Sequence, residues 1–338
     1  MQFKSVCIET MGYVVPDNVI KTIEFEEQLL SLLKPLGAPL GIIERVTGVR
    51  ESRRWDSELT VSEAASWAGE KAIVKSGIER SKIGCIVNAS VSSDFIEPAT
   101  AVLVHNRLKL SSSALAFDVT NACLGFFNGI QVVANMIELG QISSGLVVAA
   151  ERPQDGQDKT IQNLLTSPSD KNSFRDNLAS FTLGAGAVAM LLTNNDISYS
   201  KHRLTQGANY CATEHNDLCR AQSDWMHTKS EALLKAGTKA MVETWSIFEK
   251  NSGWKKSDIN RAFGHQVSEQ QRKIILKKLG FSKDIDYPTL SWLGNTGAAA
   301  APISMAIAEE NGFINDGDRV ILFGVGSGIN TMVFGIEW

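Results

Sequence analysis

The sequence predicts an α/β fold made of two similar halves, and three observations lead to this prediction. Residues 77–92 resemble residues 253–268, with Gly, Ser, Ile, Val and Ser each recurring 176 positions later without a gap. Residues 140–145 and the apolar run after them resemble residues 312–317 and their own apolar run at a spacing of 172. Between these blocks, continuous apolar runs alternate with apolar residues at helical spacing, which is typical of α/β layers.

Each half is expected to contain the same elements in the same order. These are a helix, a strand, a strand-to-helix turn, a long apolar helix, a glycine turn and a further strand. The apolar runs 145–150 and 320–323 predict the last of these strands in the first and second half. We place the first half at residues 1–176 and the second half at residues 177–338.

Composition excludes several classes of protein. The chain has 338 residues, 43% of them hydrophobic, and a formal charge of −4 with basic and acidic residues interspersed, so nothing indicates a nucleic-acid surface. The five cysteines form no Cys-x-x-Cys pair, which indicates neither a disulfide scaffold nor a zinc site. Neither a signal peptide nor an uncharged membrane-spanning stretch is visible, so we expect a soluble cytoplasmic protein.

Cys123 is the first candidate for chemistry. Residues 115–117 predict the end of a buried strand, and Phe127, Ile130, Val133 and Ile137 predict a helix that starts near Leu124. A cysteine at such a junction faces the unpaired N–H groups and positive dipole end of the helix, which favour the nucleophilic thiolate. The alternative is a small buried hydrophobic residue, because free cysteine is often fully buried.

The internal repeat adds two polar candidates in the second half. Extending the spacing of 172 places Asn295 opposite Cys123, and the spacing of 176 places His265 opposite Ala89. Both residues are therefore expected at strand ends. Taken singly, the histidine could be an ordinary structural residue and the asparagine part of a turn.

Four motifs in order resemble the thiolase superfamily, specifically its ketoacyl synthase III branch. They are Asp118-Val-Thr-Asn-Ala-Cys123, Gly264-His-Gln-Val-Ser268, Gly294-Asn-Thr-Gly297 and Gly324-Val-Gly-Ser-Gly328. The resemblance covers essentially the whole chain. It implies the five-layered α-β-α-β-α thiolase fold with two duplicated halves, usually assembled as a homodimer.

The resemblance also implies roles for the candidate residues. Cys123 corresponds to the nucleophile that forms an acyl-enzyme, which divides one difficult bond formation into two easier steps. His265 and Asn295 correspond to the pair that hydrogen-bonds the thioester carbonyl of the second substrate. The backbone N–H groups of Cys123 and Ser327 correspond to the oxyanion hole. Neither a metal nor a cofactor is implied, with acyl-CoA as the substrate.

Glu97 is a departure from the synthase III pattern. In the segment 90–100, those synthases commonly have an aromatic residue before the proline, whereas this chain has Glu97 before Pro98. A carboxylate there resembles the OleA enzymes, which join two long-chain fatty acyl-CoA molecules head to head in bacterial olefin biosynthesis. Glu97 would reach the neighbouring subunit and remove an α-proton, with its pKa raised by an apolar pocket. The alternative is a solvated loop glutamate.

Two further departures affect the expected substrate contacts. The arginine that contacts CoA in synthase III is replaced by Val46, with Arg45 adjacent, and the usual aspartate of a Gly-Asp-Gly run is absent from Leu183-Gly-Ala-Gly186. CoA contacts are therefore not transferred to this chain. Downstream enzymes of an olefin pathway are expected partners only if the OleA resemblance extends to the pathway.

Three other activities stay open at this point. The closest is a decarboxylative synthase that uses a malonyl thioester, which creates its carbanion by losing CO₂ and needs no base. A second is a Cys123-dependent acyl thioesterase. A third is a silent subunit that only binds acyl groups.

Overall fold

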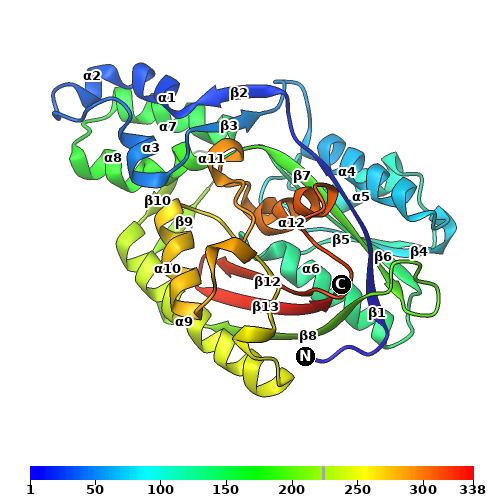
Figure 1. Cartoon of the computed structure of the whole chain (residues 1–338). Helices are drawn as coiled ribbons and strands as arrows, with labels where there is room; N and C mark the ends of the chain where they lie inside the picture. The colour runs from blue at the N-terminus through cyan, green and yellow to red at the C-terminus, as the bar shows by residue number, and fades with distance from the viewer. Residues whose placement is uncertain (223–224) are drawn as a thin grey trace.

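The computed structural model describes residues 1–222 and 225–338, and Figure 1 shows how helices and strands alternate along the chain. From the N-terminus to residue 194 the elements are β1 (Val6–Val14), β2 (Asn18–Lys21), α1 (Thr22–Gln28), α2 (Leu30–Leu33), α3 (Ile42–Thr47), β3 (Glu51–Arg54), α4 (Val61–Ser76), η1 (Arg80–Lys82), β4 (Ile83–Asn88), α5 (Thr100–Arg107), β5 (Leu115–Asp118), α6 (Gly125–Glu138), β6 (Ser144–Glu151), α7 (Gln154–Thr166), α8 (Lys171–Asn177), η2 (Leu178–Thr182) and β7 (Gly186–Asn194). After residue 194 they are β8 (His202–Cys211), η3 (Thr213–His215), β9 (Cys219–Ala221), β10 (Met226–Thr228), α9 (Ser230–Ser252), η4 (Lys256–Asp258), β11 (Arg261–Gly264), α10 (Glu269–Leu279), η5 (Lys283–Ile285), α11 (Leu290–Leu293), η6 (Gly297–Ala299), α12 (Ala300–Glu310), β12 (Arg319–Gly326) and β13 (Asn330–Glu337).

The strand order shows the duplication directly. Among the described residues, nine strands form one sheet in the order β11-β12-β13-β8-β1-β7-β6-β4-β5. The strands β4, β6, β7 and β1 pair parallel, antiparallel and antiparallel in turn, and β11, β12, β13 and β8 repeat this pattern. The two groups join where β1 meets β8 through the pairs Cys7–Arg203 and Ile8–His202.

The glycines that recur in the sequence end equivalent helices. Gly77 follows α4 with φ 67°, and Gly253 follows α9 with φ 73°. Gly140 and Gly312, both with φ 68°, lie two residues beyond the last residues of α6 and α12. Glycine adopts this left-handed conformation without steric cost, so the repeat preserves the residues that stop each helix.

Strand pairing extends the first group of strands beyond the expected boundary at residue 176. β7, at residues 186–194, pairs with β1 and β6, whereas β8 pairs with β13 along its length. The change from one group to the other therefore falls between Asn194 and His202. The reason is that the last strand of the first half follows α7, α8 and η2, three elements that have no counterpart in the repeated sequence blocks.

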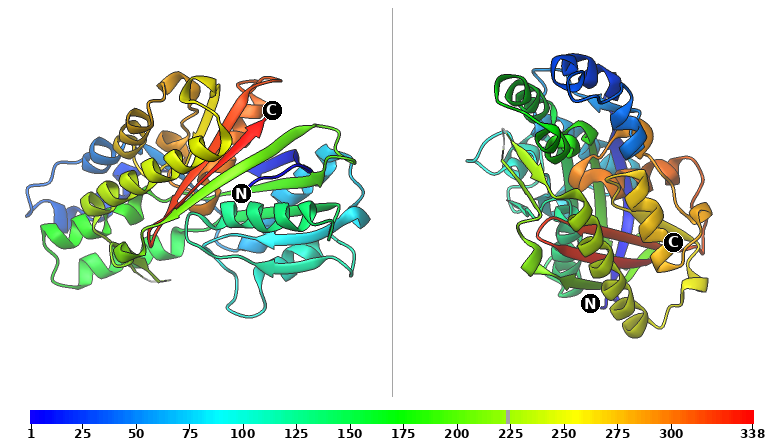
Figure 2. Two further views of the ribbon diagram at one scale, coloured as in Figure 1. Left: turned by 90° about the horizontal axis from the view of Figure 1, so that it is seen from below. Right: turned by 90° about the vertical axis from the view of Figure 1, so that its left-hand side faces the viewer.

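The helices and the sheet form five layers. One buried cluster contains α6, α12 and inward-facing residues of both strand groups, including Val147, Val320 and Leu322. The opposite face of the first group packs against α4 and α5, and residues such as Ile321 on the opposite face of the second group pack against α9 and α10. Figure 1 shows α6 and α12 in the centre, and the turned views of Figure 2 keep the outer helix pairs on separate sides. The expected α-β-α-β-α arrangement is confirmed.

Two local expectations were wrong. β5 is an edge strand with Leu115 53% exposed, not a buried strand, because no strand of residues 1–222 and 225–338 pairs with its outer side. Asn295 follows the short helix α11 rather than a strand, and the position equivalent to β5 is reduced to an isolated bridge between Ala262 and Asp286. The expected register nevertheless holds, since η6 begins at Gly297, 172 positions after Gly125 begins α6.

Two of the helices show how the sequence starts a helix and buries one of its faces. α4 begins with a capping box in which the Thr60 side chain and Glu63 exchange hydrogen bonds, which satisfies N–H groups at the start of the helix. α6 buries Phe127, Ile130 and Val133, as the sequence spacing predicts. Within residues 1–222 and 225–338, no helix has the length and hydrophobicity needed to cross a membrane.

Candidate active site

Cys123 lies in a tight turn between β5 and α6. The preceding residue, Ala122, has a φ of 46°, a left-handed conformation that residues other than glycine rarely adopt. The N–H of Leu124 donates to the carbonyl oxygen of Asn121, and the N–H of Gly125 donates to that of Ala122. Strained turns of this kind are concentrated at functional sites. The turn holds Cys123 two residues before the first residue of α6.

The glycine-rich turn between β12 and β13 packs directly on the Cys123 turn. A Cβ added at Gly326 would lie 2.9 Å from Cβ of Leu124 and 3.2 Å from the carbonyl oxygen of Asn121, so only glycine permits this approach. The side-chain amide of Asn330 also donates to Oδ1 of Asn121 at 3.3 Å. Ser327, the predicted second oxyanion-hole residue, follows Gly326 in this turn. The structure thus brings the two predicted turns together.

The surroundings of Cys123 disfavour a resting thiolate. Burial, followed by the charge of Glu151 and the neighbouring Cys219, raises the pKa of its thiol to about 12, against one opposing backbone hydrogen bond. The raised pKa runs against the expectation that the helix start would favour a thiolate, and desolvation is its largest cause. Proton removal must accompany attack on the substrate.

Asn295 has its backbone and its side chain fixed. Its N–H donates to the carbonyl oxygen of Thr182 at 2.7 Å, and its carbonyl oxygen accepts from the N–H of Gly184 at 2.9 Å. Its side-chain Oδ1 accepts from the N–H of Gly297 at 3.0 Å, which orients the amide nitrogen Nδ2 the other way. A Cβ at Gly184 would lie 1.9 Å from the carbonyl oxygen of Leu293. The Leu183-Gly-Ala-Gly186 motif therefore helps to hold the backbone of Asn295 in place.

His265 directly follows β11 and is 5% exposed. Its N–H donates to the carbonyl oxygen of Phe323 at 3.0 Å, which continues the parallel pairing of β11 with β12. Burial lowers the pKa of its imidazole to about 4, so the ring is neutral near pH 7. Its Nδ1 is buried and has no hydrogen-bond partner within the described part of the chain. A neutral imidazole can donate from one nitrogen only.

Gln266 connects His265 to the segment that leads to Asn295. Its side-chain oxygen accepts from the N–H groups of Thr289 and Leu290, both at 3.0 Å, and its amide nitrogen donates to the carbonyl oxygen of Tyr287 at 3.3 Å. The residue is 2% exposed. Sequence reasoning noticed Gln266 only as part of the Gly-His-Gln motif, although a buried glutamine beside a candidate histidine is a signal for such a role.

Glu151 is the site residue that sequence reasoning missed. It ends β6, and its carboxylate accepts hydrogen bonds from the N–H groups of Val91, Ser92 and Ala298 and from the Ser92 hydroxyl. The same carboxylate lies close enough to Cys123 to raise the pKa of its thiol. The available signal was an acidic residue that directly follows the fully apolar run 145–150.

Four of the five predicted site residues belong to this assembly of turns. Cys123 and Ser327 lie in contacting turns, and Glu151 adjoins both Cys123 and the turn that begins at Asn295. His265 directly follows β11, the neighbour of the strand that carries Gly326. Their side chains come from both halves of the chain.

Glu97 lies outside this assembly within one chain. It is exposed, in a loop whose neighbouring side chains Phe95 and Ile96 are 59% and 104% exposed. The loop is attached at its start by Val91 and Ser92, and at its end by α5, whose first N–H groups donate to Asp118. Exposed apolar side chains that lie together on a loop are typical of a surface that contacts another molecule.

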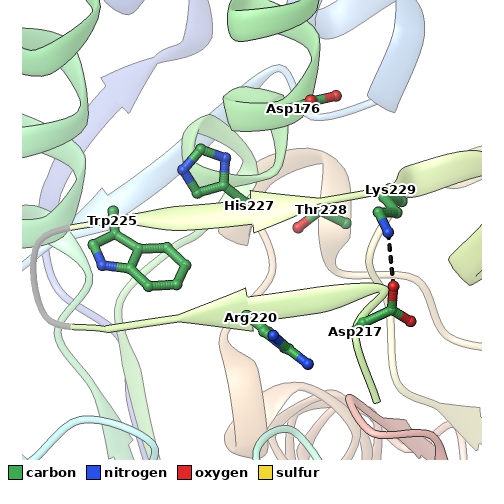
Figure 3. A pocket seen from close by; sticks show the side chains of 7 residues that line it. All are labelled: Asp176, Asp217, Arg220, Trp225, His227, Thr228 and Lys229. Carbon is green, nitrogen blue, oxygen red and sulfur yellow. Dashed lines mark hydrogen bonds and ion pairs between the residues drawn. The ribbon is translucent and has the colours of Figure 1, made fainter. Parts of the chain in front are cut away.

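A pocket of about 350 Å³ lies beside the β9–β10 hairpin, and Figure 3 shows the side chains that line it. They are Asp176, Asp217, Arg220, Trp225, His227, Thr228 and Lys229. The Cys219 thiol lies 3.5 Å from the Thr228 hydroxyl, and Cys219 is also a neighbour of Cys123. The hairpin therefore connects the pocket to the Cys123 turn. Arg45 and Val46 are exposed on α3 and do not line this pocket.

Comparison with known proteins gives consistent matches. Residues 117–207 match the family model of 3-oxoacyl-[acyl-carrier-protein] synthase III, and residues 249–338 match the model of its C-terminal part. An acyl-CoA:acyl-CoA alkyltransferase of Shewanella oneidensis is 35% identical, with 100% of both chains covered. A β-ketoacyl synthase III of Clostridium tetani is 27% identical, with 88% of this chain and 89% of the relative covered. The crystal structure of cerulenin-bound OleA from Xanthomonas campestris matches with a TM-score of 0.97 at 33% identity, covering 100% of this chain and 98% of that chain.

Proposed function

Because this chain belongs to the 3-oxoacyl-[acyl-carrier-protein] synthase III family of thiolase-fold condensing enzymes, we propose that it condenses two long-chain fatty acyl-CoA molecules without decarboxylation. The observation that carries this proposal is the carboxylate of Glu97 on a protruding apolar loop. A malonyl-dependent synthase has no need for a base, whereas condensation of two plain acyl thioesters does. The higher identity to an acyl-CoA:acyl-CoA alkyltransferase than to a synthase III supports the same choice.

In the first step, the Cys123 sulfur attacks the thioester carbonyl of one acyl-CoA. The S–H proton passes to the departing CoA sulfur, so that an acyl-enzyme and free CoA result. Because the pKa of Cys123 is high, no thiolate accumulates before the substrate binds. The N–H groups of Cys123 and Ser327 are proposed to stabilise the oxyanion, a contribution that is typically worth about 10²–10³ in rate.

In the second step, a second acyl-CoA loses an α-proton to Glu97 of the partner subunit. The Nδ2 group of Asn295 and an N–H of neutral His265 are the donors proposed for the enolate oxygen. The α-carbon then attacks the acyl group on Cys123, the C–S bond breaks, and the sulfur recovers the proton that Glu97 took from the α-carbon, so that both groups return to their starting state. The product is a 2-alkyl-3-oxoacyl-CoA, or the corresponding β-keto acid after hydrolysis.

A homodimer is part of this proposal. The exposed side chains Phe95 and Ile96 and the edge strand β5 lie close together in the sequence and leave apolar and hydrogen-bonding groups unpaired in a single chain. A second copy of the chain would cover them. Burial of the loop in an apolar pocket of the partner subunit would also raise the pKa of Glu97, as a general base requires.

We place the CoA portion of the substrate at the pocket in Figure 3, since Arg220 and Lys229 supply positive charge there and the hairpin connects it to Cys123. Lys229 is already paired with Asp217 at 2.7 Å, which leaves Arg220 as the more available cation. We propose a cytoplasmic enzyme that needs no metal or cofactor. Enzymes that reduce its product, form a β-lactone and remove CO₂ would be its partners in olefin biosynthesis.

The direct test supplies purified protein with a long-chain acyl-CoA alone and identifies the products by mass spectrometry. We expect a carbon–carbon coupled product and an acyl adduct on Cys123. Coupling that occurs only after a malonyl thioester is added would contradict the proposal, and release of free fatty acid without coupling would indicate a thioesterase. Absence of the acyl adduct would indicate a subunit that only binds acyl groups.

A further inference from the structure

Glu151 is a buried carboxylate that touches two separate segments of the site. It is 5% exposed and ends β6. Its Oε1 accepts from the N–H of Val91 at 2.9 Å and of Ala298 at 3.3 Å, while its Oε2 accepts from the N–H and hydroxyl of Ser92 at 3.0 and 2.8 Å. One carboxylate thus binds the start of the Glu97 loop and the turn after Asn295.

Burial raises the pKa of Glu151, whereas the hydrogen bonds that its carboxylate accepts lower this pKa and favour the ionised form. All of its hydrogen-bond partners are donors, whereas a protonated carboxyl would need an acceptor for its own O–H. Within residues 1–222 and 225–338, no lysine, arginine or histidine forms an ion pair with Glu151. A buried charge compensated only by hydrogen bonds loses much of its stabilisation when any of the donors moves.

Both segments that Glu151 holds lead directly to a proposed reacting group. Ser92 begins the loop that presents Glu97 five residues later. Ala298 follows Gly297, whose N–H orients the amide of Asn295. The fit at this turn is tight, because a Cβ at Gly297 would lie 3.0 Å from Oε1 of Glu151.

We infer that Glu151 is a positioning residue for carbon–carbon bond formation. Its hydrogen bonds attach the loop that carries Glu97 and the turn after Asn295 to the end of β6, beside Cys123. This inference rests on the proposed function. In the dimer, Glu151 would orient Asn295 in its own subunit and the root of the Glu97 loop that serves the other site. It makes no contact with substrate in this role.

The first experiment measures two half-reactions in the Glu151→Gln variant of the full-length protein. Acylation is followed by intact-protein mass spectrometry of the Cys123 adduct after addition of a long-chain acyl-CoA, and condensation is followed by product formation. Gln has the same shape, but its NH₂ group faces N–H donors. We expect condensation to fall about 100-fold, as for a small misplacement of reacting groups, with acylation changed less than about 3-fold.

A second measurement separates this role from a general loss of structure. Removing the negative charge beside Cys123 should move the pH profile of its alkylation by iodoacetamide to lower pH, with Cys219 as the other titratable neighbour of the thiol. The matched control is Glu9→Gln. Glu9 is also 5% exposed and accepts from Ser198, Thr193 and Tyr199, but it lies on β1, outside the site. We expect this variant to keep the wild-type alkylation profile and the wild-type ratio of the half-reactions.

Gly297→Ala provides an independent variant that keeps the charge. Its added Cβ lies against Glu151 and also strains the left-handed backbone at φ 54°, so the turn after Asn295 should shift and condensation should fall while the alkylation profile stays unchanged. Equal loss of acylation and condensation in Glu151→Gln, or full condensation in either variant, would overturn the inference. A wild-type protein that acylates Cys123 but yields no coupled product would instead contradict the proposed function.

Discussion

The side-chain oxygen of Asn295 accepts a hydrogen bond from the backbone N–H of Gly297 at 3.0 Å. Because a backbone N–H can only donate, this contact identifies the oxygen end of the amide and leaves Nδ2 as the donor for a ligand. The backbone of Asn295 is held on both sides by Thr182 and Gly184. A donor fixed in this way needs no reorganisation when charge develops on an enolate.

The orientation of Asn295 predicts the effect of Asn295→Asp. Aspartate can still accept from Gly297, but it lacks the Nδ2 donor and adds a negative charge. Condensation should fall by about 10²–10³, the usual effect of removing one such donor, while the Cys123 adduct still forms. Product and adduct are measured by mass spectrometry. Loss of the adduct as well would show that Asn295 is needed before condensation.

The raised pKa of Cys123 predicts slow alkylation at neutral pH. A thiol with a pKa of about 12 carries little thiolate at pH 7.5, and its alkylation rate should rise about tenfold per pH unit up to pH 10. Exposed Cys211 serves as the internal reference. Peptide mass spectrometry after brief treatment with iodoacetamide should show Cys211 modified before Cys123. Selective modification of Cys123 at pH 7.5 would contradict the pKa direction.

Burial of His265 predicts a loss of stability in acid. Its pKa is about 4 in the folded protein and about 6.5 when unfolded, so the unfolded chain binds more protons between these values and stability falls as the pH falls. Between pH 7.5 and 4.5 this group should cost about 2–3 kcal/mol of unfolding free energy. Urea unfolding of His265→Gln should show a smaller loss over this range than the wild type. The exposed His227→Gln serves as the control, and an identical pH dependence in all three proteins would refute the effect.

Glu97→Gln should lower the rate of condensation at least about 100-fold, because an amide cannot remove the α-proton. The Cys123 adduct should form as in the wild type, since acylation does not use this carboxylate. Glu58→Gln, at another exposed loop glutamate, is the control. Full condensation by Glu97→Gln would favour the malonyl-dependent reaction.

Ile96→Asp should weaken the proposed dimer. Ile96 is fully exposed in a single chain, so its replacement should leave the monomer folded but place an unpaired charge in the interface. Light scattering after size-exclusion chromatography should show monomers, and condensation should fall because Glu97 can no longer reach the second site. A dimer with unchanged activity would contradict this assignment of the loop.

The fold was largely predictable because its signals are local. Helix-stopping glycines such as Gly77 and Gly253 and apolar periodicity in α6 act through neighbouring residues, so they are legible in the sequence and recur in both halves. The first group of strands extends past residue 176 because β7 joins the sheet after helices that have no repeated counterpart. Edge position likewise depends on distant strands, which is why the exposure of β5 was missed.

The sequence by itself determined the duplication, the junction at Cys123 and the polar candidates His265, Asn295 and Glu97, because the repeat and the motifs are linear patterns. Only the tertiary structure decided the protonation states of these groups and their contacts. The high pKa of Cys123, the neutral ring of His265 and the bridging role of Glu151 all come from desolvation and contacts between segments far apart in the chain. Such effects depend on distances in space, which linear spacing does not encode.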